Sequence, residues 1–88
     1  MTEEELPEAT FTHLVLMLAT TGLMQLGDAP NPMTQKSEPN LRMARVTIDT
    51  LVMLKEKTEG HLTRDEDELL EGMLYELRMN YLEKTKGS

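Results

Sequence analysis

The segment Phe11–Leu26 has the length of a helix and carries no charged side chain. It reads FTHLVLMLATTGLMQL. A helix that is apolar all round has to be buried on more than one side. The chain has only 88 residues, so it offers little other surface with which to bury such a helix. The segment therefore predicts that protein covers this helix along its length, in part from a second chain.

The length of the chain predicts one domain. We expect a flexible acidic segment over residues 1–10, a single helical domain over 11–84 and a frayed tail over 85–88. Cysteine is absent and aromatic residues are limited to Phe11, Tyr75 and Tyr81, so the core is expected to consist of Leu, Met, Val, Ile and Ala. Eight methionines are present. We expect these methionines to fill gaps in the core rather than to form an adaptable binding surface, which is the other common use of methionine.

The net charge of −7 limits the classes of partner. Acidic residues gather near the start of the chain and again at Asp65–Glu68. Phosphate backbones and anionic lipid would repel such a chain, so neither nucleic acid nor a membrane surface is expected to bind it. A secretory signal needs basic residues where this chain is acidic, and the apolar run is shorter than the ~20 residues that span a bilayer. We therefore expect a soluble, cytoplasmic protein.

Apolar periodicity and end signals predict an all-α, three-helix unit with helices over about 11–26, 39–59 and 63–84. Thr10 is suited to cap the first helix, and Gly27 to end it. Pro39 is suited to the first turn of the second helix. Thr63 and Glu66 form a capping box before the third. A proline-rich loop over residues 28–40 joins the first two helices and is long for a compact domain.

The third helix has two apolar stripes, and this feature also predicts association. Its main stripe consists of Leu70, Met73, Leu74, Leu77 and Tyr81, and Tyr75, Met79 and Leu82 form a second stripe across the helix. Burying one large apolar side chain stabilises a protein by ~1.5–3 kcal/mol, so several left in water are costly. Twofold self-association is the simplest remedy, with a patch kept for a different protein as the alternative. The predicted interface consists of Val15, Met17, Leu18, Gly22, Met24, Tyr75, Met79 and Leu82.

No motif predicts a metal site, a cofactor site or a catalytic residue. His13 and His61 are the only histidines, and neither has the helical spacing of a zinc or di-iron site. His13 is expected to be a buried or interfacial polar group. The acidic run Asp65–Glu68 lacks the spacing of a calcium loop. No serine stands in a nucleophile motif, and no glycine-rich phosphate loop is present.

Three functions follow, in decreasing order of support. The first is a non-enzymatic homo-oligomer that acts as an adaptor or a small regulatory subunit. The second is a binder of an apolar small molecule, held between helices with Met17 and Met24 lining the space. The third is a catalyst that uses the scattered carboxylates Asp49, Glu71 and Glu76, and it would need them to converge in one pocket.

Several segments together resemble a small bacterial family of all-helical proteins, the domain of unknown function 1844 family. They are FTHLVLMLATTGLMQLG (11–27), DAPNPMT (28–34), PNLRMA (39–44), TIDTLVMLKEKTEGHLT (47–63) and LYELRMNYLE (74–83). The resemblance implies an all-helical fold and no reaction, cofactor or substrate, so no residue inherits a role from it. The chain departs from the family pattern at Gln35, where a turn glycine is expected, and at Gly72, where a bulkier residue is commoner.

Overall fold

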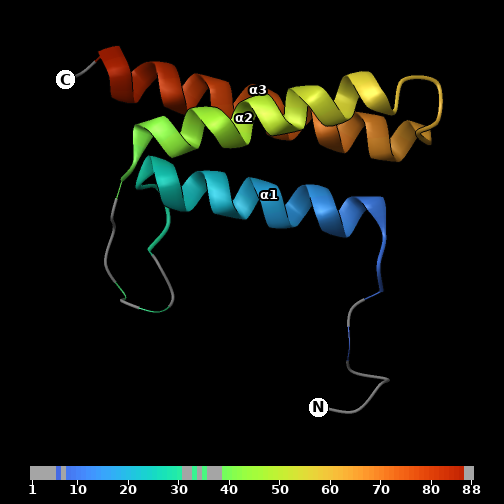
Figure 1. Ribbon diagram of the computed structural model, residues 1–88, viewed down its shortest axis with the longest axis horizontal. Helices are drawn as coiled ribbons and strands as arrows, with labels where there is room; N and C mark the ends of the chain where they lie inside the picture. The colour runs from blue at the N-terminus through green and yellow to red at the C-terminus, as the bar shows by residue number, and fades with distance from the viewer. Residues whose placement is uncertain (1–5, 7, 31–32, 34, 36–38, 87–88) are drawn as a thin grey trace.

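The computed structural model describes residues 6, 8–30, 33, 35 and 39–86. It consists of three helices, α1 (Phe11–Leu26), α2 (Leu41–Lys57) and α3 (Arg64–Lys86), and these described residues contain no strand. Successive helices run in opposite directions, and each helix packs against both others (Figure 1). The predicted all-α, three-helix unit is therefore confirmed. Most of the expected flexible segment, 1–5 and 7, lies outside the described residues, as do 87–88 of the expected frayed tail.

The local end signals act as predicted at three helix ends. The hydroxyl of Thr10 accepts a hydrogen bond from the His13 amide at 3.0 Å. At the start of α3, the Thr63 hydroxyl accepts from the Glu66 amide at 3.2 Å, and the Glu66 carboxylate accepts from the Thr63 amide at 2.8 Å. Gly27 ends α1 with φ of 83°, a left-handed conformation that glycine adopts without steric cost.

The predicted bounds of α2 and α3 need correction. Helix α2 begins at Leu41 rather than at Pro39, because the side chain of Asn40 accepts a hydrogen bond from the Met43 amide at 3.2 Å and caps the helix there. It ends at Lys57, two residues earlier than predicted. Helix α3 continues to Lys86, so Thr85 and Lys86 are helical rather than frayed.

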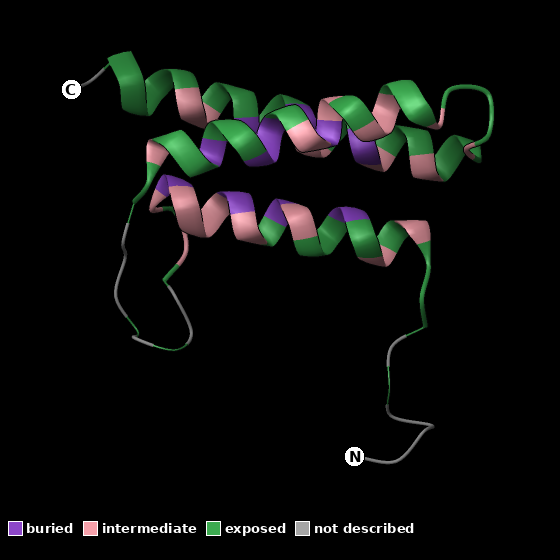
Figure 2. Cartoon of the chain, viewed as in Figure 1, coloured by how far each residue is buried: buried purple, intermediate pink, exposed green. Residues whose placement is uncertain are grey.

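The core is built from leucine and small side chains of all three helices. Helix α1 contributes four buried residues at spacings of four, three and four: Val15, Ala19, Gly22 and Leu26. The buried apolar residues are Val15, Ala19, Leu26, Ala44, Ile48, Leu51, Leu70, Leu74 and Leu77. No described methionine belongs to this set, and Met73 alone among them is half-buried and packed against it, so the expectation that methionine fills the core holds only for Met73 at the edge of the core. The buried positions lie on the sides of the helices that face one another (Figure 2).

Three features fix how α1 lies against α2 and α3. A Cβ atom placed on Gly22 would lie 3.1 Å from one δ-carbon of Leu77 and 3.4 Å from Cγ2 of Thr47, so the glycine allows a close approach. The buried hydroxyl of Thr47 donates to the side-chain oxygen of Gln25, which satisfies the one polar side chain in the buried set. The carbonyl of Gln25 also accepts from the Asn40 amide at 2.6 Å, and this bond joins the end of α1 to the start of α2.

Gln35 adopts a backbone conformation that favours glycine, with φ of 58°. This is the position at which the family resemblance implies a turn glycine. We expect Gln35→Gly to raise the free energy of unfolding by up to about 1 kcal/mol, because relief of the left-handed strain exceeds the added entropy of the unfolded chain. Urea denaturation followed by circular dichroism measures the change.

Gly60→Ala is the control for Gln35→Gly, because it introduces backbone strain at a left-handed position, whereas the other substitution removes it. The φ of Gly60 is 82°, and a Cβ there would meet no atom within 4 Å. Gly60→Ala should therefore lower the free energy of unfolding by about 1 kcal/mol through backbone strain alone. If Gln35→Gly lowers the free energy of unfolding by a similar amount, the proposed backbone strain at Gln35 is contradicted.

Candidate interaction surface

Helix α1 presents an uncharged face opposite its buried side. At 100° per residue, His13, Met17, Thr20 and Met24 lie on the arc away from Val15 and Gly22; these four residues are called the α1 outer face. Met17 is 54 % exposed, Thr20 is exposed, and His13 and Met24 are half-buried. Figure 2 shows the exposed side of α1 turned away from α2 and α3. One chain alone therefore leaves this face open to solvent.

The structure separates the eight residues of the predicted interface. Val15 and Gly22 are buried inside the single chain, where they contact the other helices and cannot reach a second chain in this fold. Leu18 is half-buried and packs against the same core. Met17 and Met24 remain on the α1 outer face. The part of the prediction that placed Val15 and Gly22 at an interface is therefore replaced by a role in the core.

On α3, the second apolar stripe is exposed at each of its three residues. Tyr75 is 69 %, Met79 46 % and Leu82 57 % exposed, so this part of the predicted interface is accessible. Gly72 lies on the same side, and a Cβ at that position would meet nothing within 4 Å. A bulkier residue would fit there in the single chain.

Other exposed apolar side chains lie outside the predicted interface. Leu14 and Leu16 are exposed on α1, and Met43, Val46 and Met53 are exposed on α2. Val46 and Met53 lie one heptad apart within the otherwise polar arc of α2, and both are exposed there. The exposed methionines are Met17, Met33, Met43, Met53 and Met79. Most of the described methionines are therefore exposed on the surface rather than buried in the core.

Two open grooves run between α2 and α3. Their volumes are about 560 Å³ and about 540 Å³, and both are lined by Val52, Lys55 and Glu71. The first groove lies toward the α2–α3 turn, and most of the residues that line it are polar or charged. The second is lined by Leu74, Tyr75, Arg78, Met79 and Leu82 in addition to the shared residues. Neither groove is lined by Met17 or Met24, the residues that the small-molecule hypothesis places around a ligand.

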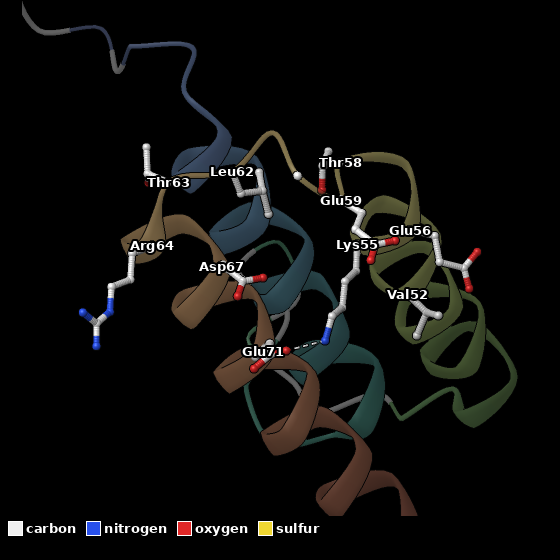
Figure 3. Close-up of a pocket in the computed structure, with 11 residues that line it drawn as sticks. Val52, Lys55, Glu56, Thr58, Glu59, Leu62, Thr63, Arg64, Asp67 and Glu71 are labelled. Atoms are coloured by element: carbon white, nitrogen blue, oxygen red, sulfur yellow. Dashed lines mark hydrogen bonds and ion pairs between the residues drawn. The ribbon is translucent and has the colours of Figure 1, made fainter.

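An ion pair separates the two grooves. Lys55 extends from α2 and donates a hydrogen bond to the carboxylate of Glu71 on α3, while Arg64 points away from the groove (Figure 3). This hydrogen bond, together with the negative charges of Glu71 and Asp67, raises the pKa of Lys55 above its ordinary value of 10.5. Lys55 therefore stays protonated across the neutral range, and the pair holds α2 to α3 at a partly exposed site.

The scattered carboxylates do not converge in the described part of the chain. Asp49 and Glu76 are exposed and line neither groove, whereas Glu71 is engaged by Lys55. Among residues 6, 8–30, 33, 35 and 39–86, no three His, Cys, Asp or Glu side chains gather as metal ligands would. His13 lies half-buried at the start of the α1 outer face and His61 is exposed. No helix in the described ranges combines the length and the hydropathy needed to cross a bilayer.

Comparison with known proteins identifies the family of the chain. No curated protein and no solved structure matches it. The model of one family, described as a domain of unknown function (DUF1844), matches residues 8–83 and thus includes all of α1 and α2 and nearly all of α3. The chain therefore belongs to the DUF1844 family.

Proposed function

We propose that this protein is a non-enzymatic interaction module that acts as a homo-oligomer in the cytoplasm, with the α1 outer face covered by a second copy of the chain. The role is that of an adaptor or a small regulatory subunit. The observation that carries the proposal is the open, uncharged face of α1. More than half of the surface of Met17 is exposed in the single chain, and no charged residue occurs anywhere in α1.

The chemistry of the face supports a contact made by packing. The Thr21 hydroxyl, beside this face, donates to the carbonyl of Met17 at 3.0 Å, so its one donor is used within the helix. Methionine side chains adapt to the shape of a partner, and Thr20 is small enough to allow a second helix to come near. The exposed Met17 beside uncharged side chains is therefore compatible with a protein-protein interface.

The charge distribution favours a second copy as the partner. In a twofold interface, a residue on the axis faces its own counterpart, and a contact from one residue to another is made twice. A charged residue on the axis would face the same charge on the other copy. Charged residues are common outside α1 in this chain of net charge −7, whereas α1 has none. The spacings of four, three and four at His13, Met17, Thr20 and Met24 match the apolar repeat of paired helices. An antiparallel pair would place Met17 of one copy against Thr20 of the other.

A charge introduced on this face tests the proposal. Met17→Glu should abolish the contact, because pairing would bury an unpaired carboxylate on each copy. Sedimentation equilibrium should give the parent chain a mass of at least twice 10.0 kDa and the variant about half the mass of the parent. Thr12→Glu, which adds the same charge at an exposed position elsewhere on α1, is the matched control and should keep the mass of the parent. Equal masses for the parent chain and Met17→Glu at every concentration would overturn the proposal.

A further inference from the structure

Helix α3 carries an outward-facing stripe with the spacing of a heptad repeat. Its members are Glu68, Gly72, Tyr75, Met79, Leu82 and Lys86, at alternating intervals of four and three residues; they are called the α3 outer stripe. All six are exposed. They lie on the side of α3 away from its buried residues Leu70, Leu74 and Leu77. Alternating intervals of four and three are those of the contact positions in a coiled coil.

We propose that the α3 outer stripe binds the same stripe of a second copy, with the two helices antiparallel and the twofold axis level with Leu77. In this register, each layer pairs one residue with a different residue of the other copy. Tyr75 lies against Met79, Gly72 lies against Leu82, and Glu68 lies against Lys86. Twofold symmetry repeats each pairing on the other side of the axis, so six layers form along the stripe.

The charges at the ends of the stripe favour this arrangement over the parallel one. Antiparallel helices bring Glu68 of each copy to Lys86 of the other. Each end of the contact then pairs a negative side chain with a positive one. Parallel helices in register would instead place Glu68 beside Glu68 and Lys86 beside Lys86, which is destabilising. Glu68 also accepts from Arg64 at 3.1 Å within its own helix, and a carboxylate has lone pairs for a second donor.

The shapes of the apolar residues are complementary in the same register. Gly72 leaves open space above the helix, and this space admits Leu82 of the second copy. Tyr75 and Met79 form a sulfur-aromatic pair, a favourable contact in protein cores and interfaces. The groove of about 540 Å³ that Tyr75, Met79 and Leu82 share with α2 widens the surface on which the second helix can rest.

The electrostatic cost of bringing two copies together is small along this stripe. The whole chain carries a net charge of −7, but residues 68–86 contain four carboxylates and three cationic side chains. Arg78, which lines the groove beside the stripe, is one of these cations. Residues 68–86 therefore carry a net charge of only −1, whereas the acidic residues Asp65, Glu66 and Asp67 of the first turn of α3 lie just before the stripe. The α3 contact is separate from the α1 contact, and the two together give a dimer of dimers.

Charge substitutions on both helices separate the two contacts. Met79→Glu should remove the α3 contact and, in sedimentation equilibrium, leave a dimer that the α1 outer face holds together. Met17→Glu should leave a dimer held by α3, and the double variant should be a monomer. A mass for Met79→Glu equal to that of the parent chain at every concentration would overturn the α3 contact. If Met17→Glu keeps the parent mass while Met79→Glu halves it, the α3 contact stands and the proposed α1 interface fails.

Cross-linking tests the antiparallel register, since the chain contains no cysteine. Chains with Gly72→Cys are mixed with chains with Leu82→Cys and oxidised, with Met17→Glu present in both. The mixture should form a disulfide-linked dimer, because these two positions oppose each other. Each variant alone should stay uncross-linked, because ten residues along the helix place the two like positions roughly 15 Å apart, beyond the reach of a disulfide. Cross-linking of Gly72→Cys alone, or none in the mixture, would overturn the register.

Discussion

Leu51→Ala should destabilise the fold by about 2–5 kcal/mol, the range for removing a fully buried leucine side chain. Leu51 is 0 % exposed and lies on the side of α2 that faces the other two helices. Its removal leaves a cavity that these helices can fill only in part. Domains of this size have a total stability of ~5–15 kcal/mol, so the variant should lose a large fraction of its stability. Urea denaturation followed by far-ultraviolet circular dichroism measures the loss.

Met53→Ala is the matched control on the same helix. Met53 is 43 % exposed, and its truncation should change the free energy of unfolding by no more than about 0.5 kcal/mol. Both variants and the parent are compared at one protein concentration, because association makes the measured stability depend on concentration. Equal losses in the two variants would contradict the assignment of the core.

Gly22→Val should destabilise the fold by about 1–3 kcal/mol, the usual cost of overpacking a core. A Cβ atom at this position would already lie 3.1 Å and 3.3 Å from the two δ-carbons of Leu77. Valine adds two further methyl groups in the same space, and Leu77, only 1 % exposed, has little room to move. The same denaturation measurement gives the change in stability.

Gly72→Ala is the control for this prediction. In the single chain its Cβ would enter open space, so with Met79→Glu present to remove the proposed α3 contact, the variant should gain about 1 kcal/mol from the higher helix propensity of alanine. The comparison also decides between two roles for Gly22. If Gly22→Val unfolds at the same urea concentration as the parent but has a lower mass in solution, Gly22 is an interface residue, and its placement in the core is wrong.

The sequence predicted best those features that depend on a few neighbouring residues. The hydrogen bonds made by Thr10, Thr63 and Glu66 join residues three apart, so the sequence alone contains both partners. The start of α2 was misplaced because Pro39 and Asn40 are both suited to the start of a helix. The structure distinguishes them by the bond from the Met43 amide to the Asn40 side chain.

Periodicity separates the arc of α1 with Val15, Ala19 and Gly22 from the arc with Met17, Thr20 and Met24, but neither arc is charged, so the pattern alone does not show which arc is buried within the chain. The orientation of α1 is set by partners far away in the chain, such as Leu77 against Gly22 and Thr47 against Gln25. The small side chains of Ala19 and Gly22, three residues apart, were the available signal of a close helix contact. Helix α3 has one exposed side, and Tyr75, Met79 and Leu82, which the sequence predicts at an interface, are exposed on it. Their place in an interface stays a prediction.

The rate of methionine oxidation tests most directly whether a second copy covers the α1 outer face. Oxidation of a methionine depends on its access to solvent, and mass spectrometry reports each site separately. Met33, which is 89 % exposed, provides the internal reference in the same molecule. We predict that Met17 oxidises at a rate comparable to Met33 in dilute solution and several-fold more slowly when the protein is concentrated. A ratio of the two rates that stays the same across the dilution series would contradict the proposal that α1 is an interface.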